Sequence, residues 1–318
     1  MNIEECLSEM KTLQENVLDY IQDEESIEEK FQNLDITIND IKIRDNKNKL
    51  SLFLRFISNI CNNHHRFPFL ISKIERILQL LKESIIKNYS NKEIFNIFEN
   101  SKRILLFLIE EQIMNVDEYI ASNLQSNKYY HQNYQFYFAP EIKPFKDEKW
   151  FPKLPDNFNE LRRIGENENL ICKLIREDSI KDFIVYVNKN DVTLNSDIKE
   201  SIYETNSFIN EINKEKSASY SFYQIKKYIK LIDYAAFFGS LKIFNYLNLN
   251  GAELTSSSPI FAVHGQNAEI IHIIEDKIIE PQLKNANSFG SIKKENPYKL
   301  CFIESIKCHH NEIAYYFL

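Results

Sequence analysis

The sequence predicts an all-α fold, in which a helical solenoid of stacked helix pairs follows an N-terminal helical region. Apolar residues recur at spacings of three and four along most of the 318 residues, and this is the period of an amphipathic helix. Glycine and proline are scarce, at 5 and 8 residues, whereas strand-rich folds with many tight turns need more of both. The last third of the chain also contains similar segments that recur, and such repetition is typical of a solenoid.

The N-terminal helical region is assigned to residues 1–124. Residues 1–40 have the apolar spacing of one amphipathic helix, and a short coiled coil is the weaker alternative because the heptad pattern does not persist. Helices joined by short loops are typical of a bundle or an α-solenoid. Further helical faces are predicted at 49–62, 68–86 and 91–113, with loops at 63–65 and 88–91.

An aromatic and proline-rich connector is expected at residues 125–160. Four prolines between positions 140 and 155 are too closely spaced for a long helix, because proline lacks the amide hydrogen that a helix needs. The aromatic side chains here, which include Trp150, are expected to pack between two helical units. The alternative is that they line a groove that binds a peptide.

Residues 161–318 are expected to form the repeat domain, and the first clear copy is 231–254. The two alanines of this copy are small enough for neighbouring helices to approach closely. Each of its two glycines can adopt the left-handed backbone conformation that ends a helix. Two aliphatic residues on one face of the second helix are expected to pack against the next copy. The packing residues of this copy are Ala235, Ala236, Gly239, Ile243, Leu247 and Gly251.

A second copy is expected at 258–276. Ala262 aligns with Ala235 at an offset of 27 residues, and the same offset aligns Ile270 with Ile243. The copy departs from the first where Gln266 takes the position of the glycine that ends the first helix.

A third copy is expected at 300–318, where Ile313 aligns with Ile270 at an offset of 43 residues. A weaker copy precedes the others at 178–183. The third copy stops at Leu318, within its second helix, so an apolar end without a polar capping helix is expected.

The first copy resembles an ankyrin repeat in two motifs, YAAFFGS at 234–240 and NGAEL at 250–254. Other motifs are similar to those of a protist-expanded ankyrin-repeat family that carries a domain of unknown function: RRIGEN at 162–167, ETNSF at 204–208, GQNAEIIH at 265–272 and IKCHHN at 306–311. The resemblance covers roughly residues 100–318. It implies a stack of divergent ankyrin repeats and no known biochemical activity. An ankyrin unit has about 33 residues. The offset of 27 residues between the first and second copies therefore implies a short finger loop at 255–258, and the offset of 43 residues between the second and third copies implies an insertion at 278–297.

The resemblance implies a non-catalytic protein–protein interaction module or scaffold, whose partner the sequence does not identify. Ankyrin stacks expose a concave face and a row of finger loops, and partner contacts are expected there. One alternative is a self-associating structural or vestigial repeat protein that stacks through the apolar residues 315–318. Another is an uncharacterised enzyme, which requires a pocket with convergent acidic or histidine side chains. The residues expected to contact the partner are Asn250, Glu253, Thr255, Ser240, His264 and Gln266.

The composition argues against nucleic acid or a membrane as the partner. The formal net charge is −7, whereas nucleic-acid-binding proteins usually carry a basic face. The longest apolar stretch, 104–109, is far shorter than the roughly 20 residues of a membrane-spanning helix. The acidic N-terminus is not a secretory signal, and five dispersed cysteines favour a reducing compartment. We therefore expect the protein to be cytoplasmic, with the nucleus as the alternative.

No metal site, cofactor or catalytic residue is predicted. The clusters Cys61-x-x-His64-His65 and Cys301…Cys308-His309-His310 contain metal ligands, but neither has the two spaced pairs that are typical of structural zinc. Adjacent histidines on a helix also point about 100° apart. The sequence contains no motif of the common hydrolases, phosphate-binding loops or kinases.

Overall fold

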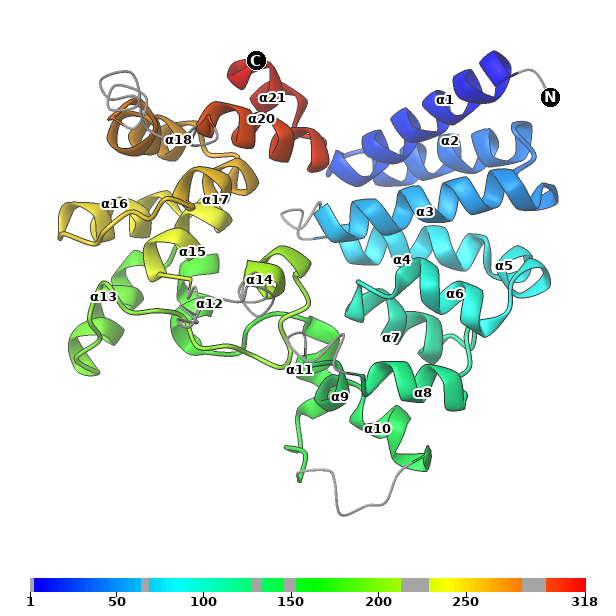
Figure 1. The fold of residues 1–318 in the computed structure, drawn as a ribbon, viewed down its shortest axis with the longest axis horizontal. Coiled ribbons are helices and arrows are strands. Elements are labelled where there is room, and N and C mark those ends of the chain that lie inside the picture. Colours follow the sequence, from blue (N-terminus) through cyan, green and yellow to red (C-terminus); the bar gives the residue numbers. More distant parts are fainter. Residues whose placement is uncertain (1–2, 64–68, 127–132, 146–152, 213–228, 282–295) are drawn as a thin grey trace. The chain divides into compact units, whose positions relative to one another are not determined.

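The computed structural model describes residues 3–63, 69–126, 133–145, 153–212, 229–281 and 296–318, and its regular structure within these ranges is helical (Figure 1). This confirms the predicted all-α class. The one extended pairing among these residues is an isolated antiparallel bridge between Asp197 and Lys230.

The chain divides into two compact units. Unit 1 comprises Met1–Gly165 with Thr205–Ser207, and unit 2 comprises Glu166–Glu204 with Phe208–Leu318. Unit 1 therefore includes both the N-terminal helical region and the connector that the sequence analysis had placed at 125–160. Unit 2 includes the segments that recur.

Unit 1 is built from short helices that share one apolar core. Residues 1–40 were expected as one helix, but residues 3–40 form two helices that pack against each other. The break follows Asp23, whose carboxylate accepts hydrogen bonds from the backbone amides of Ser26 (2.7 Å) and Glu25 (2.8 Å). These bonds lower the pKa of Asp23, and the turn that they stabilise replaces helical pairing. The helices are α1 (Ile3–Gln22), α2 (Ile27–Asp40), η1 (Ile43–Asp45), α3 (Lys47–Asn63), α4 (Leu70–Leu80), α5 (Lys82–Asn88), α6 (Asn91–Phe98), α7 (Lys102–Glu110), α8 (Glu118–Leu124), α9 (Tyr134–Tyr137), α10 (Ala139–Ile142), η3 (Lys143–Phe145) and α11 (Phe158–Ile164).

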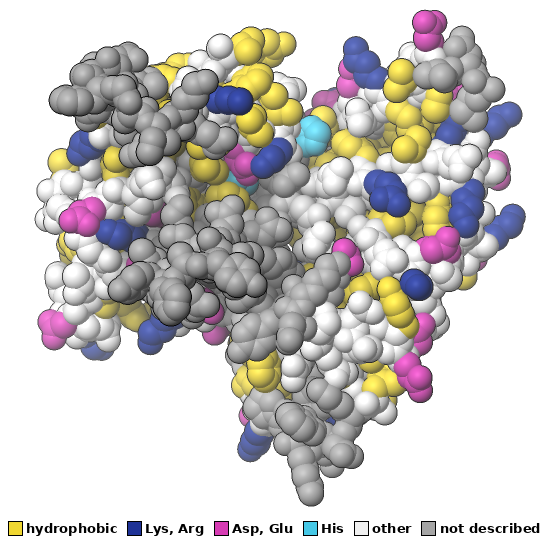
Figure 2. All heavy atoms as spheres, viewed as in Figure 1, with side chains coloured by type: hydrophobic (Ala, Val, Ile, Leu, Met, Phe, Trp, Pro, Cys, Tyr) yellow, Lys and Arg dark blue, Asp and Glu magenta, His cyan; other side chains and the backbone are white. Residues whose placement is uncertain are grey.

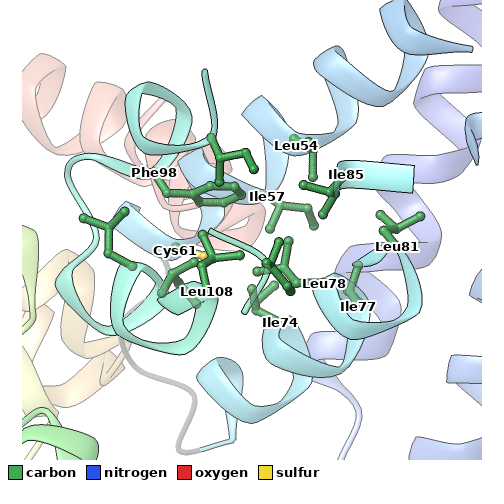
Figure 3. Close-up of a cluster of buried hydrophobic side chains, with 14 of the residues drawn as sticks. Leu54, Ile57, Cys61, Ile74, Ile77, Leu78, Leu81, Ile85, Phe98 and Leu108 are labelled. Atoms are coloured by element: carbon green, nitrogen blue, oxygen red, sulfur yellow. The ribbon is translucent and has the colours of Figure 1, made fainter. Parts of the chain in front are cut away.

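The centre of unit 1 is formed by aliphatic and aromatic residues of α3, α4, α6 and α7 (Figure 3). Leu54, Ile57, Ile74, Phe98 and Leu108 are each fully buried. Burial of one such side chain contributes about 1.5–3 kcal/mol, so this cluster is the main source of stability for the unit.

The described part of the connector packs into unit 1. Tyr134, Tyr137 and Phe138 are fully buried. The hydroxyl of Tyr137 donates to the carbonyl of Arg162 (2.7 Å), and the guanidinium of Arg162 donates to the carbonyl of Tyr137 (3.1 Å). These reciprocal bonds fix the connector against α11. Trp150 lies outside the described residues, as does much of the expected peptide-binding groove.

The described residues of unit 2 form four helix pairs. The first helices contact one another in the order α12, α15, α17 and α20, and among the second helices α16 contacts both α13 and α18 (Figure 1). The helices are α12 (Leu170–Arg176), α13 (Ile180–Lys189), α14 (Ser207–Ile212), α15 (Leu231–Phe238), α16 (Leu241–Leu249), α17 (Ser258–Gly265), α18 (Ala268–Ile274), the π-helical η5 (Glu275–Ile279), α20 (Pro297–Lys307) and α21 (Asn311–Phe317).

In each pair, a residue with left-handed backbone separates the two helices. These residues are Asp178, Gly239, Gln266 and His309, with φ of 47°, 63°, 50° and 56°. Gly251, which follows α16, has φ of 84°. Both glycines that the sequence analysis singled out therefore occupy conformations that other residues adopt only at a cost.

The residues expected to pack the repeats lie mostly in the core of unit 2. Ile313 of α21 is only partly buried, but it packs against that core. The fully or nearly fully buried members are Ala235, Ala236, Ile243, Leu247, Ala262 and Ile270.

Replacement of two glycines by alanine is expected to destabilise the protein for different reasons. A Cβ on Gly251 would meet nothing within 4 Å, so Gly251→Ala should cost only the backbone strain of a left-handed residue, about 1–2 kcal/mol. A Cβ on Gly265 would lie 1.9 Å from the carbonyl oxygen of Ala236. Gly265→Ala must therefore separate α17 from α15 and should cost more, about 3 kcal/mol. Urea denaturation of both variants measures the difference, and equal losses would contradict the close approach.

Candidate functional site

The finger loop after α16 carries two of the residues expected to contact a partner. Asn250 and Glu253 are both exposed. The backbone amide of Glu253 donates to the side-chain oxygen of Asn195 (2.8 Å), and the carboxylate of Glu253 lies 3.1 Å from the ammonium of Lys230. The side-chain amide of Asn250 donates to the carbonyl of Tyr246 (2.7 Å). The loop is thus anchored while these two side chains remain exposed. The binding role of Asn250 and Glu253 stays a prediction.

Leu249 is a further exposed residue at this finger, with 83% of its surface accessible. It is the last residue of α16, and it lies off the buried face formed by Ile243, Phe244 and Leu247. Leu249 was not among the predicted contact residues, although its position two residues after the buried Leu247 in a helix indicates exposure.

The side chain of Thr255 is directed from the loop toward the interior of the protein. Its hydroxyl donates to Asp233 (3.0 Å), and its backbone amide donates to the hydroxyl of Ser258 (2.8 Å). Ser258 in turn donates to the other oxygen of Asp233 (2.5 Å), which is almost fully buried. Thr255 therefore satisfies a buried carboxylate and ties the finger to α15 and α17.

Ser240 and His264 do not lie on the surface as expected, because only 2% and 1% of their surface is exposed. The hydroxyl of Ser240 donates to the carbonyl of Ile175 (2.5 Å) in the preceding helix pair. Both side chains face the neighbouring pair rather than solvent. A contact of either one with a partner would require that interface to open.

Gln266 is exposed, but its side chain bridges two helix pairs. Its amide nitrogen lies 2.7 Å from Nε2 of His310, and Nδ1 of His310 lies 3.1 Å from the carbonyl oxygen of Val263. Since the amide is a donor and the carbonyl an acceptor, His310 carries its proton on Nδ1.

His264 is the centre of a polar cluster between α17 and α20. Its Nε2 lies 3.0 Å from a carboxylate oxygen of Glu304. The sulfur of Cys308 lies 3.5 Å from Nδ1 and 3.8 Å from Nε2. The imidazole packs against the rings of Phe208 and Phe237, with centroid distances of 4.2 and 5.0 Å. These rings fix its orientation.

The electrostatics of this cluster distinguish its carboxylate from its thiol. Burial disfavours ionisation of Glu304, but the hydrogen bond and charge of His264, together with the charge of Lys307, outweigh it and lower the pKa of Glu304. Burial raises the pKa of Cys308 far above its usual range. Cys308 is thus a protonated thiol.

The thiol of Cys308, the imidazole of His264 and the carboxylate of Glu304 are neighbours in space. A nucleophilic role for Cys308 is nevertheless disfavoured. A catalytic cysteine is a thiolate in an accessible, electropositive setting. Cys308 is instead fully buried and has a raised pKa. The remaining chemistry open to this trio is metal coordination, since the ligand atoms of His264, Glu304 and Cys308 all lie within 4.8 Å of one another.

The trio differs from both clusters considered in the sequence. Cys308 belongs to it, but its other members come from one turn earlier on α20 and from α17. Cys61 lies in the core of unit 1, and His64 and His65 lie outside the described residues. The spacing of Glu304 and Cys308 by four was visible in the sequence, but the approach of His264, 40 residues away, was not.

Comparison with known proteins gives no relative: no family model, curated protein or solved structure matches the chain. Among the described residues, no helix combines the length and apolar character needed to cross a membrane.

Thr255→Ala and Asn250→Ala are expected to separate structural from surface positions in the finger. Thr255→Ala removes a donor to the buried carboxylate of Asp233 and should reduce the free energy of unfolding by about 1–3 kcal/mol. Asn250→Ala changes an exposed side chain and should stay within about 0.5 kcal/mol of the parent. Urea denaturation compares the two, and an equal effect of both changes would argue against the buried network.

Proposed function

We propose that residues 166–318 form an ankyrin-type repeat solenoid that binds another protein through its finger loops, without catalysis. The main support is a contact that recurs between helix pairs. Ser240 and His310 each follow directly after a left-handed residue. Ser240 lies within hydrogen-bond distance of the carbonyl of Ile175, and His310 within that distance of the carbonyl of Val263. Each carbonyl belongs to the preceding helix pair and lies three residues before the left-handed residue of that pair.

The junction between the pairs α15–α16 and α17–α18 also brings two backbones close together. The carbonyl of Ala236, three residues before Gly239, is the atom that a Cβ on Gly265 would meet. A glycine there lets the backbones of α15 and α17 touch without a side chain between them. The carbonyl three residues before the left-handed residue is therefore approached at each of the three junctions, by the residue after the next left-handed residue at two of them and by the residue before it, Gly265, at the other. This recurrence supports a stack of like units.

The long spacing between Asp178 and Gly239 is explained by an insertion. The amide of Ile198 donates to the carbonyl of Ile229 (2.8 Å), and the amide of Leu231 donates to the carbonyl of Ser196 (3.1 Å). These bonds bring together the two ends of segment 198–229. Without this segment, the spacing of the two pairs is close to the unit of about 33 residues that ankyrin repeats have.

The finger after α16 has the composition of a protein-binding site. Leu249 exposes a large aliphatic side chain beside the polar Asn250, and the charged Glu253 lies nearby. An apolar anchor with a polar rim is typical of the residues that dominate binding energy in protein interfaces. An exposed finger held by a rigid helix stack also loses little conformational entropy on binding.

Self-association is the second candidate function. Tyr315 and Leu318 of the last helix pair are 78% and 83% exposed, and Figure 2 shows hydrophobic side chains at the surface around α20 and α21. Phe317 is buried against the core and does not belong to this surface.

Photo-crosslinking from the finger tests the proposed interface. p-Benzoylphenylalanine in place of Leu249 should form a crosslink to a distinct protein in lysate of the source cells, read by mass spectrometry. The matched control carries it in place of Val185, an aliphatic residue of α13 with 64% exposure. Crosslinking of the same protein with equal yield from Val185 would contradict the finger assignment, and crosslinking only to the chain itself would favour self-association.

Once the partner is identified, an affinity measurement adds a second check. Leu249→Ala combined with Glu253→Ala should raise the dissociation constant about tenfold, equal to 1.4 kcal/mol, because both side chains leave the interface. The melting temperature should not change, since both residues are exposed and the ion pair of Glu253 is a surface pair. An unchanged dissociation constant would contradict the proposal.

A further inference from the structure

We propose that His264, Glu304 and Cys308 bind a single zinc ion between α17 and α20. All three side chains belong to unit 2: His264 is in α17, Glu304 is in α20, and Cys308 is the residue that directly follows α20. The proposal does not depend on a protein partner, and it gives the cluster a role that protein binding does not explain.

The distances in the cluster are close to those of a tetrahedral site. Zinc bonds of about 2.0–2.2 Å to nitrogen and oxygen and about 2.3 Å to sulfur place neighbouring ligand atoms roughly 3.3–3.6 Å apart. Here Nε2 of His264 lies 3.0 Å from Oε1 of Glu304 and 3.8 Å from Sγ of Cys308. Shifts of a few tenths of an ångström bring these two pairs to the ideal separations, and the third pair, the carboxylate of Glu304 and the sulfur of Cys308, lies within 4.8 Å.

The local structure places the ligands for joint coordination. Glu304 and Cys308 are four residues apart at the end of α20, so they project from the same face one turn apart. The imidazole of His264 reaches them from α17, and its ring is held by Phe208 and Phe237. A side chain that is already oriented loses little freedom when it binds a metal.

The charges of the cluster also match a divalent ion. A carboxylate, a thiolate and a neutral imidazole together carry two negative charges, so that bound Zn²⁺ gives a neutral site in a buried location where net charge is costly. Sulfur and imidazole ligands select zinc over magnesium or calcium, which prefer oxygen. Binding displaces the thiol proton of Cys308 to solvent and leaves the imidazole proton on Nδ1 of His264.

The carboxylate of Glu304 can offer one of its two oxygens to a metal ion. Its second oxygen lies 3.2 Å from the ammonium of Lys307, which leaves Oε1 directed at His264. The Glu304 side chain is 13% exposed, whereas that of His264 is 1% exposed. The fourth coordination position therefore lies on the side of Glu304, where a water molecule can enter from solvent.

Zinc bound here would connect the third and fourth helix pairs. The two pairs are separated in sequence by residues 282–295 and contact each other through α17 and α20. A metal bond between these helices adds a direct tie across their interface, so metal occupancy should stabilise the packing of α20 and α21.

Metal titration of the reduced full-length protein tests the site. Zinc is titrated against a chromophoric chelator, and cobalt serves as a spectroscopic probe. We expect one zinc per chain, a near-ultraviolet charge-transfer band from sulfur to cobalt, and a higher melting temperature with zinc. Cys308→Ser should abolish the band and weaken zinc binding by more than the roughly 10–100-fold that loss of an outer-shell partner costs.

The matched control is Cys301→Ser, because Cys301 is a buried cysteine of the same helix outside the cluster. It should keep both the cobalt band and the zinc affinity. Glu304→Gln changes a partly exposed side chain, so it should keep the sulfur-to-cobalt band but weaken zinc binding. This variant provides the test if Cys308→Ser does not fold. Absence of stoichiometric binding, an unchanged zinc affinity in Cys308→Ser or Glu304→Gln, or an equal loss of affinity in Cys301→Ser would overturn the proposal.

Discussion

Each helix pair of unit 2 depends on one residue with left-handed backbone between its two helices. At Asp178, Gly239, Gln266 and His309 the chain leaves the first helix and enters the second within a few residues. This tight reversal lets the second helix fold back beside the first. Because the same reversal recurs, each pair presents the same end to its neighbours. The contacts between pairs follow from this shared geometry.

The polar groups at these ends are satisfied by the neighbouring pair rather than by water. Ser240 donates to a carbonyl of the preceding pair, and the buried carboxylate of Asp233 accepts from both Thr255 and Ser258. A buried polar group without a partner costs about 1–3 kcal/mol, so a shift of one pair relative to the next would leave several such groups unpaired. Hydrophobic burial supplies most of the stability, while these hydrogen bonds fix the register.

The helical period of the sequence predicted the fold class and the positions of most helices, because burial of one helical face is a local property of the sequence. The break after Asp23 was not predictable in this way, since it depends on a carboxylate that competes for backbone amides. Repeats were clearest where small residues and glycine remain, at 235–239. The copy at 178–183, where Asp178 provides the reversal, was weak.

The candidate site was less predictable than the fold. Ser240 and His264 were expected at the surface because the ankyrin resemblance places partner contacts near the ends of the first helices and the fingers. Their burial is decided by residues distant in sequence, such as Ile175 and Glu304. The same limitation hid the cluster of His264, Glu304 and Cys308, because only one of its three residue pairs, Glu304 with Cys308, lies within a helical turn. The exposure of Leu249, by contrast, was predictable, because Ile243 and Leu247 already define the buried face of α16.

The stacking of one helix pair on the next is tested most directly by amide hydrogen exchange at the start of α16. There the backbone amides of Lys242 and Ile243 donate to the carboxylate of Asp178 in the preceding pair (3.1 and 2.9 Å). Asp178→Gly keeps a residue suited to the left-handed turn but removes this cap. Exchange at both amides should become about fivefold faster, as expected for loss of about 1 kcal/mol. The amide of Ile270, which is capped by Asn267 within its own pair, should not change. Unchanged exchange at Ile243, or an equal increase at Ile270, would contradict the stacked arrangement.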